Sequence, residues 1–217
     1  MIHASLHRQR VTGRGDATRA ARCGAWGLWL LLGTLLAVPA HDAWADGQQC
    51  LDRVQHEYAK KFDDIPHVPA GQVAQLIEQG EDVLLVDVRE AEEYGVSRIQ
   101  GAVRIDPDQW SWDVVEGLRE AAEGKTVVLY CSVGYRSSQM ASAVREGLLD
   151  RGARNVVNMI GGIFAWHNTG RPLVDAGGNQ TPWVHPYDRY WARFVEFPEL
   201  TRMEPGVQTG SKSTAVR

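Results

Sequence analysis

The sequence predicts an α/β fold built around a mostly parallel sheet. Short runs rich in β-branched residues alternate with longer segments in which apolar residues recur at helical spacing. The run 83–86 (VLLV) is apolar at every position, as expected for a strand that is buried on both faces of a parallel sheet. Because strands and helices alternate along the chain, helices should cover the faces of this sheet.

The expected elements follow one another between residues 66 and 174. Gly152 should end the last helix of this series, because glycine readily adopts the left-handed conformation that often follows a helix C-terminus. The strands are expected at 83–86, 102–105, 126–130 and 155–158, and the helices at 73–79, 112–122 and 137–150.

Two segments flank this region. Residues 175–205 are rich in aromatic side chains, and we expect a helix over 188–197 that packs on the domain, with a face for a periplasmic protein partner as the alternative. The small and polar residues of 206–217 predict a disordered tail. Residues 46–65 predict a short amphipathic helix, because their apolar side chains recur at spacings of three and four. These side chains are Leu51, Val54, Tyr58 and Phe62.

Residues 1–45 have the composition of a signal peptide. Five arginines precede an apolar stretch of 14 residues (25–38), and small residues stand at Ala43 and Ala45, where a signal peptidase would cut. The apolar stretch is shorter than the ~20 residues that a permanent membrane anchor needs. We therefore expect export to a bacterial periplasm, with anchoring to the membrane if the segment stays uncleaved.

The charge balance of the exported chain argues against some classes of partner. Residues 46–217 carry 18 Lys and Arg against 25 Asp and Glu, which gives a net charge of −7. No cluster of basic residues remains, so binding to nucleic acid or to anionic lipid is not expected.

The segment that follows the strand at 126–130 is the candidate active site. Cys131 stands at a turn from strand to helix, where backbone N–H groups and the helix dipole converge and stabilise a thiolate. A buried structural cysteine is the alternative, but Gly134, Arg136 and the neighbouring serines give this turn a polar character that suits an anion. The candidate loop comprises Cys131, Ser132, Val133, Gly134, Tyr135, Arg136 and Ser137.

Three blocks of sequence resemble those of the single-domain rhodaneses, the thiosulfate:cyanide sulfurtransferase-like proteins. Residues 85–102 are similar to the D-x-R … E-[YF] … H-I-x-G-A block, except that Arg98 replaces the usual His. Residues 131–137 are similar to the C-x-x-G-x-R-S loop, and residues 161–172 to the G-G … W … G-x-P ending. The resemblance covers about residues 66–174 and implies the rhodanese-like fold, with a mostly parallel five-stranded sheet and helices on both faces.

The resemblance also implies a sulfurtransferase that uses no metal or cofactor. Cys131 would take the outer sulfur from a donor such as thiosulfate or a persulfide and pass it to cyanide or a thiol. Gly134 would allow the tight backbone of the loop, and Arg136 would guide anions or brace the loop. Ser137 would cap the following helix, and Tyr135 would shape the access of the acceptor at the rim.

Two further expectations follow from the same motifs. Asp87 and Arg89 should support the loop from below as a hydrogen-bonded pair, without a direct part in catalysis. The loop length argues against phosphatase activity, because only four residues separate Cys131 from Arg136. The related phosphatases have five, typically with a His before the Cys, where this chain has Tyr130.

Two other functions stay open on the sequence alone. In a thiol-redox or persulfide-relay module, Cys50 would resolve disulfides formed at Cys131, although the chain has no C-x-x-C motif. An oxidising compartment would also permit a Cys50–Cys131 disulfide, but the polar surroundings of Cys50 favour a spare or partner-facing thiol. A non-catalytic rhodanese-like binding module is disfavoured by the presence of Cys131.

Overall fold

The computed structural model describes residues 41–206, with side chains from Gln49 onward. Its centre is one sheet of five parallel strands in the order β1-β5-β4-β2-β3, which confirms the predicted α/β class and the five-stranded parallel sheet. The strands are β1 (His67–Pro69), β2 (Val83–Asp87), β3 (Val103–Arg104), β4 (Thr126–Tyr130) and β5 (Asn155–Ile160).

Side chains of neighbouring positions in β2 and β4 point to opposite faces of the sheet, and both faces are buried. Leu85 and Val128 belong to one core, while Val86 and Leu129 belong to the other. Burying a side chain of this size is worth about 1.5–3 kcal/mol, so the two apolar strands anchor the fold. Helices therefore cover both faces, as expected.

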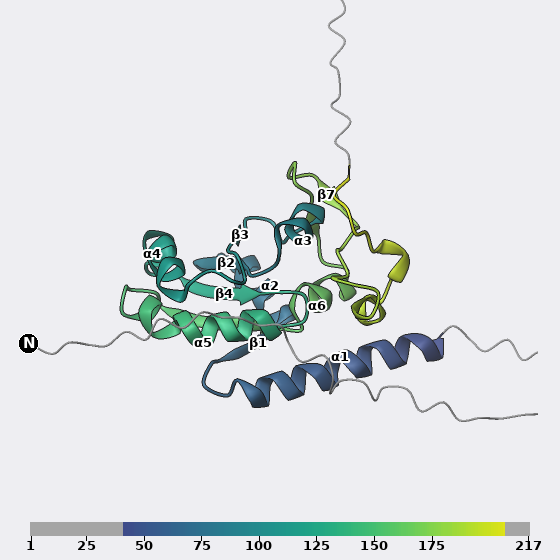
Figure 1. Cartoon of the computed structure of the whole chain (residues 1–217), viewed down its shortest axis with the longest axis horizontal. Coiled ribbons are helices and arrows are strands. Elements are labelled where there is room, and N and C mark those ends of the chain that lie inside the picture. The colour runs from purple at the N-terminus through teal and green to yellow at the C-terminus, as the bar shows by residue number, and fades with distance from the viewer. Residues whose placement is uncertain (1–40, 207–217) are drawn as a thin grey trace, which may run out of the picture.

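Within residues 41–206, six α-helices accompany the sheet. Helices α4 and α5 pack on one face, and α1, α2 and α6 contribute to the core of the other face. Figure 1 shows α1 as the long helix below α5 and α6, with the yellow C-terminal segment beside α6. The helices are α1 (His41–Lys61), α2 (Ala70–Glu78), α3 (Ala91–Val96), α4 (Ser111–Ala122), α5 (Tyr135–Leu149) and α6 (Gly162–Asn168).

The helix expected in the N-terminal flanking segment is present as α1. Leu51 and Val54 are buried in the core that α1 shares with α2 and α6. Tyr58 is half-buried on the same face and packs against this core. The amphipathic spacing therefore marks the side of α1 that docks on the domain.

The C-terminal end of α5 confirms the part expected of Gly152. This glycine has a φ of +93°, in the left-handed region. Its N–H bonds to the carbonyl of Leu149, and the N–H of Ala153 bonds to the carbonyl of Leu148. Together these bonds close the last turn of the helix in the manner of a Schellman motif.

The α-helix expected over 188–197 is wrong. The segment forms only the short 3-10 helices η1 (Trp191–Phe194) and η2 (Pro198–Leu200). The side chain of Asp188 accepts hydrogen bonds from the N–H groups of Tyr190 and Trp191, which caps a single turn. Pro198 then disfavours the helical conformation at the residue before it.

A side chain from the domain also competes for the backbone of this segment. Asn168 donates to the carbonyl of Phe194 and accepts from the N–H of Glu196, so both groups are used outside any helix. Before this segment the chain forms a two-stranded antiparallel sheet, β6 (Leu173–Val174) with β7 (Gln180–Thr181), which was not predicted.

Most of the signal segment predicted at 1–45 lies outside the described residues, as does nearly all of the predicted tail at 206–217. Within residues 41–206, none of the helices combines the length and the apolar character needed to cross a membrane.

Candidate functional site

Cys131 lies between the end of β4 and the start of α5, at the carboxyl edge of the parallel sheet. Its side chain is almost fully enclosed, with 1% of its surface exposed. The N–H of Gly134 donates to Cys131 Sγ at 3.2 Å. Because α5 begins at Tyr135, the sulfur also lies at the positive end of this helix. Both features stabilise negative charge on the sulfur.

Gly134 gives the loop its shape. Its φ of +104° lies in the left-handed region, which suits glycine, and it stands at the N-cap of α5. A Cβ at this position would be 3.4 Å from the side chain of Asn158 and from the backbone of Gly161. The sequence-based expectation that Gly134 permits a tight turn agrees with this geometry.

The start of α6 holds the other side of the loop. The N–H groups of Ile163 and Phe164 donate to the carbonyls of Cys131 and Ser132 at 2.8 and 3.1 Å. Gly162 is required at this contact, because a Cβ there would lie 2.2 Å from the carbonyl oxygen of Cys131. The loop carbonyls are thus engaged by α6, away from the amide that faces the sulfur. This contact gives the double glycine of the third sequence block a physical role.

Arg136 forms a buried ion pair with Glu93 of α3. Its Nη1 and Nη2 donate to the two carboxylate oxygens at 2.7 and 2.9 Å, and Nη2 also reaches Ser132 Oγ at 3.0 Å. The Ser132 hydroxyl itself donates to Glu93 at 2.8 Å. Of the two roles left open for Arg136, the geometry therefore favours the brace, since the guanidinium is already engaged.

The Glu93 carboxylate is 2% exposed. Burial by itself would raise its pKa, but the hydrogen bonds and charge of Arg136 outweigh burial, and the pKa is lowered. Glu93 also accepts from the N–H of Glu90 at the start of α3, which fixes its position. Sequence reasoning did not place Glu93 in the site. Two features of the sequence could have pointed to it: Glu93 lies in the first block of the resemblance, residues 85–102, and Arg136 in the loop needs an acidic partner.

Asp87 and Arg89 form the expected hydrogen-bonded pair, with contacts of 2.8 and 2.7 Å between two fully buried side chains. Arg89 also donates to the carbonyl of Ser97 at 2.6 Å. The guanidinium lies 5.9 Å from the ring centroid of Tyr130, the residue that precedes Cys131. The pair thus packs next to the C-terminal end of β4, from which the loop begins.

Ser137 does not cap α5, so that prediction is wrong. It lies inside the first turn and is fully buried, and among the described residues its hydroxyl has no hydrogen-bond partner. The helix starts two residues earlier than expected, because Gly134 takes the left-handed conformation at the N-cap. Val133 points into the core that α1 also joins.

Both flanking segments reach the loop, which the sequence did not reveal. The ring of Tyr135 makes edge contacts with Tyr58 and Phe62 at centroid distances of 5.1 and 5.5 Å. Lys61 donates to the Tyr135 hydroxyl at 2.9 Å. On the C-terminal side, the guanidinium of Arg136 lies 5.0 Å from the ring of Tyr187. Tyr135 is therefore at the rim, as expected, but its neighbours come from outside the region of resemblance.

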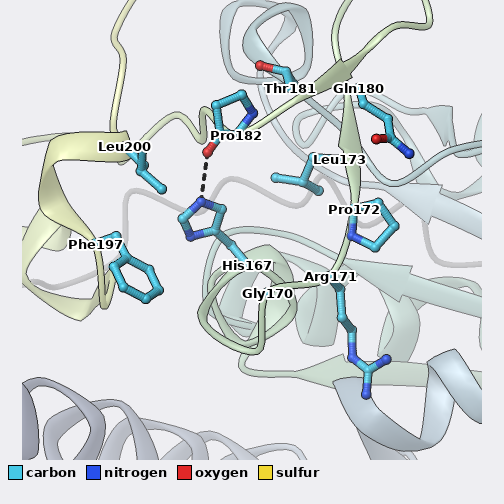
Figure 2. Close-up of a pocket in the computed structure, with 10 residues that line it drawn as sticks. All are labelled: His167, Gly170, Arg171, Pro172, Leu173, Gln180, Thr181, Pro182, Phe197 and Leu200. Carbon is cyan, nitrogen blue, oxygen red and sulfur yellow. Dashed lines mark hydrogen bonds between the residues drawn. The ribbon is translucent and has the colours of Figure 1, made fainter.

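A separate cavity of about 380 Å³ lies at the other end of α6, between that helix and the chain around β7. Figure 2 shows His167 extending from α6 toward Pro182, whose carbonyl accepts from His167 Nε2 at 2.9 Å. Leu173, Phe197 and Leu200 provide apolar walls. None of the predicted loop residues lines this cavity.

Comparisons with a family model and with curated proteins point to the same family. A family model described as "Rhodanese-like domain" matches residues 69–169. A protein named "Sulfurtransferase" from Allochromatium vinosum is 30% identical over 114 residues, which are 52% of this chain and 99% of that protein. "Thiosulfate sulfurtransferase GlpE" from Actinobacillus succinogenes is 31% identical over 100 residues, 46% of this chain and 83% of that protein.

A longer relative also matches. "Probable adenylyltransferase/sulfurtransferase MoeZ" from Mycobacterium tuberculosis is 32% identical over 96 residues, 44% of this chain. The matched region covers only 23% of that protein, so this chain spans less than a quarter of the length of this relative.

Proposed function

Because this chain belongs to the rhodanese-like family, we propose that it is a sulfurtransferase that carries a sulfane sulfur on Cys131. The observation that carries the proposal is the position of Cys131 Sγ, 3.2 Å from the N–H of Gly134 and at the N-terminal end of α5. A thiosulfate sulfurtransferase that is 31% identical over 100 residues supports thiosulfate as a donor.

In the first half of the reaction the Cys131 thiolate attacks the outer sulfur of thiosulfate. A bond forms between the two sulfur atoms, the original S–S bond breaks, and sulfite leaves with its electron pair. The product is a persulfide on Cys131. In the second half, cyanide or a thiolate attacks the outer sulfur and Cys131 leaves as a thiolate. Thiocyanate or an acceptor persulfide is released, and the enzyme returns to its starting state.

The loop supports both halves of the reaction in the same way. Negative charge resides on Cys131 Sγ before loading and on the persulfide afterwards, so a fixed N–H donor and a helix N-terminus favour each state. The Glu93–Arg136–Ser132 contacts and the bonds from α6 hold the loop in one shape. Arg136 acts on the sulfur through the loop, since Glu93 already binds both of its terminal nitrogens.

We further propose that the protein works in a bacterial periplasm, which rests on the signal-like composition of residues 1–45. Thiol acceptors and sulfur oxyanions that reach this compartment are then the relevant substrates. Fractionation of cells that express the full chain tests the location, and recovery of the protein in the cytosol alone would contradict it.

The test of the proposed function is direct detection of the intermediate. Thiosulfate treatment of the full-length protein should add one sulfur, about 32 Da, to the peptide that contains Cys131, as covalent catalysis requires. The adduct should disappear when cyanide is added, with release of thiocyanate in equal amount. A protein that turns over thiosulfate with Cys131 unmodified would refute this mechanism.

Cys50 should be dispensable for the transfer. Cys50 lies on α1, half-buried against the core that this helix shares with the domain, whereas Cys131 lies in the loop. Replacing it with Ala should leave the rate of thiocyanate formation within about twofold of the wild type, because no step uses it. The rates are compared for protein kept reduced and protein exposed to air. A severe loss confined to Cys50→Ala would instead support the thiol-redox alternative.

A further inference from the structure

Four tyrosines form a group that begins in the Cys131 loop, and three of them come from outside the region that matches the family model. We refer to Tyr58, Tyr135, Tyr187 and Tyr190 as the tyrosine collar. Tyr58 belongs to α1, and the last two belong to the segment after β7. Tyr58 contacts Tyr135 edge to face at 5.1 Å and is within electrostatic range of Tyr190, while Tyr187 stacks on Arg136.

Tyr58 contacts the loop through the ring of Tyr135, and its hydroxyl interacts electrostatically with Cys131. Burial raises the pKa of its hydroxyl, and the charge of the Cys131 thiolate raises it further, so the hydroxyl stays protonated beside the thiolate. The ring packs against the core that includes Val133 of the loop. Only 1% of Cys131 is exposed, and Tyr58 packs on Tyr135 of the same loop, so its ring is placed to limit the access of a reactant to the sulfur.

Helix α1 is fastened to the loop at several points. Lys61 donates to the Tyr135 hydroxyl, and its ammonium lies 4.7 Å from the centre of that ring. One turn before Tyr58, Gln55 lies so near the turn that precedes α6 that a Cβ on Gly161 would meet its Nε2 at 2.6 Å. The C-terminal half of α1 therefore lies against Tyr135 at the start of α5 and against the turn that precedes α6.

A partly buried chain of hydrogen bonds fixes the end of α1 to the sheet. Asn158 of β5 donates to His67 Nδ1 at 3.1 Å, so His67 Nε2 carries the proton and donates to the carbonyl of Phe62 at 2.8 Å. The residue that follows α1 is thus tied to the strand next to the one that carries Cys131. This arrangement gives Tyr58 a fixed position at the entrance.

We propose that Tyr58 is a specificity-determining residue for the sulfurtransferase reaction, on which this inference rests. Its ring narrows the route to the Cys131 persulfide, so that a small acceptor such as cyanide reaches the outer sulfur and a bulky thiol such as glutathione is held back. Both acceptors would perform the same displacement: the nucleophile binds the outer sulfur, the S–S bond breaks, and its electron pair goes to Cys131 Sγ. Tyr58 therefore selects by size at the entrance, and the chemistry at the sulfur is unchanged.

The width of the entrance can be measured without any sulfur transfer. Two maleimides of different size, N-methylmaleimide and fluorescein-5-maleimide, share one reactive group, and mass spectrometry of the Cys131 peptide reports each rate in the full chain. We expect the small reagent to be favoured in the wild type, and Tyr58→Ala to lower that preference about tenfold by opening the route. Tyr58→Phe, which keeps the ring, and the exposed control Lys60→Ala should stay within about twofold of the wild type.

Acceptor kinetics on the persulfide provide the second measurement. Tyr58→Ala should raise kcat/KM for glutathione about tenfold and leave kcat/KM for cyanide within about threefold, because only the large acceptor meets the ring. An equal change for both acceptors would show that Tyr58 serves the fold alone and would overturn the inference. If Tyr58→Ala does not fold, Tyr58→Leu is used instead, because it fills part of the space without a ring. It should also lower the preference for the small maleimide and raise kcat/KM for glutathione relative to cyanide.

The two proposals fail in different ways. A protein that never forms the Cys131 persulfide refutes the proposed function, and the maleimide rates still test the entrance. A persulfide-forming protein in which Tyr58→Ala keeps the wild-type preference for the small maleimide overturns the inference and leaves sulfur transfer standing.

Discussion

Replacing Cys131 with Ser should lower the rate of thiocyanate formation from thiosulfate and cyanide by at least about a thousandfold, because a hydroxyl cannot form the persulfide intermediate. The serine keeps the size and the polar character of the side chain, so the contact with the N–H of Gly134 can be retained. The loop is also held by α6 and by Glu93, neither of which depends on the sulfur.

The loss of activity should therefore occur without a loss of structure. The melting temperature of Cys131→Ser, measured by circular dichroism, should stay within about 4 °C of the wild type, which corresponds to a change in unfolding free energy of about 1 kcal/mol or less. Retention of more than a tenth of the activity by a folded Cys131→Ser protein would mean that another group carries the sulfur.

Replacing Glu93 with Gln should produce the largest combined effect on stability and activity outside the nucleophile. The change leaves the guanidinium of Arg136 without its carboxylate in a mostly buried site, and removing one partner of such a pair costs about 3–5 kcal/mol. An amide offers one acceptor oxygen where the carboxylate offers two, so part of the hydrogen bonding to Arg136, Ser132 and the N–H of Glu90 is lost, and the transfer rate should also fall by at least about tenfold. Urea unfolding and the thiocyanate assay measure the two effects.

The matched control is Glu116→Gln. Glu116 also pairs with an arginine, Arg151, but both side chains are partly exposed. Such a pair contributes only about 0–1 kcal/mol, so this variant should unfold at nearly the wild-type urea concentration and keep its activity. Equal destabilisation of the two variants would show that the Glu93 pair has no special role.

The same carboxylate makes a definite contribution to the dependence of stability on pH. The folded-state pKa of Glu93 is lowered, so its stabilisation is fully present above the unfolded-state value, about 4.3. It is lost as the pH falls from there through the lower folded-state pKa. The stability difference between the wild type and Glu93→Gln should therefore be constant near neutral pH and shrink on acidification below about pH 4.3. A difference that grows on acidification would contradict the lowered pKa.

The fold and the position of Cys131 in the turn from strand to helix could be predicted from the sequence because their signals are local. The apolar runs at β2 and β4 identify buried strands, and Cys131 is placed by the strand before it and the helix after it. The contact between Glu93 and Arg136 spans 43 positions, so no local pattern reveals it. Glu93 stands among other acidic residues in the sequence, and such a residue is typically exposed to solvent unless it has a buried partner.

The errors have equally specific causes. The spacing of aromatic residues from Tyr187 onward favours a helix, but Asn168 accepts from the N–H of Glu196, which a helix would have bonded to a carbonyl four residues earlier, and Pro198 follows directly after the segment. Ser137 was assigned to the helix cap because serine is common there, whereas glycine in a left-handed conformation starts α5 earlier. In both cases a competing hydrogen bond or backbone conformation overrode a residue preference.

The separation in sequence between the loop and its two flanks has a consequence for synthesis. Lys61 and Tyr135 are 74 positions apart, and Tyr187 follows the loop by another fifty. A ribosome adds about 5–20 residues per second from the N-terminus. Cys131 is therefore synthesised seconds before the C-terminal segment whose Tyr187 contacts the loop. During that interval a nascent chain offers a bare cysteine to oxidants and to other thiols. Delivery of this protein in active form thus depends on a reducing or shielded passage until the 51 residues that follow Arg136, up to and including Tyr187, have been made.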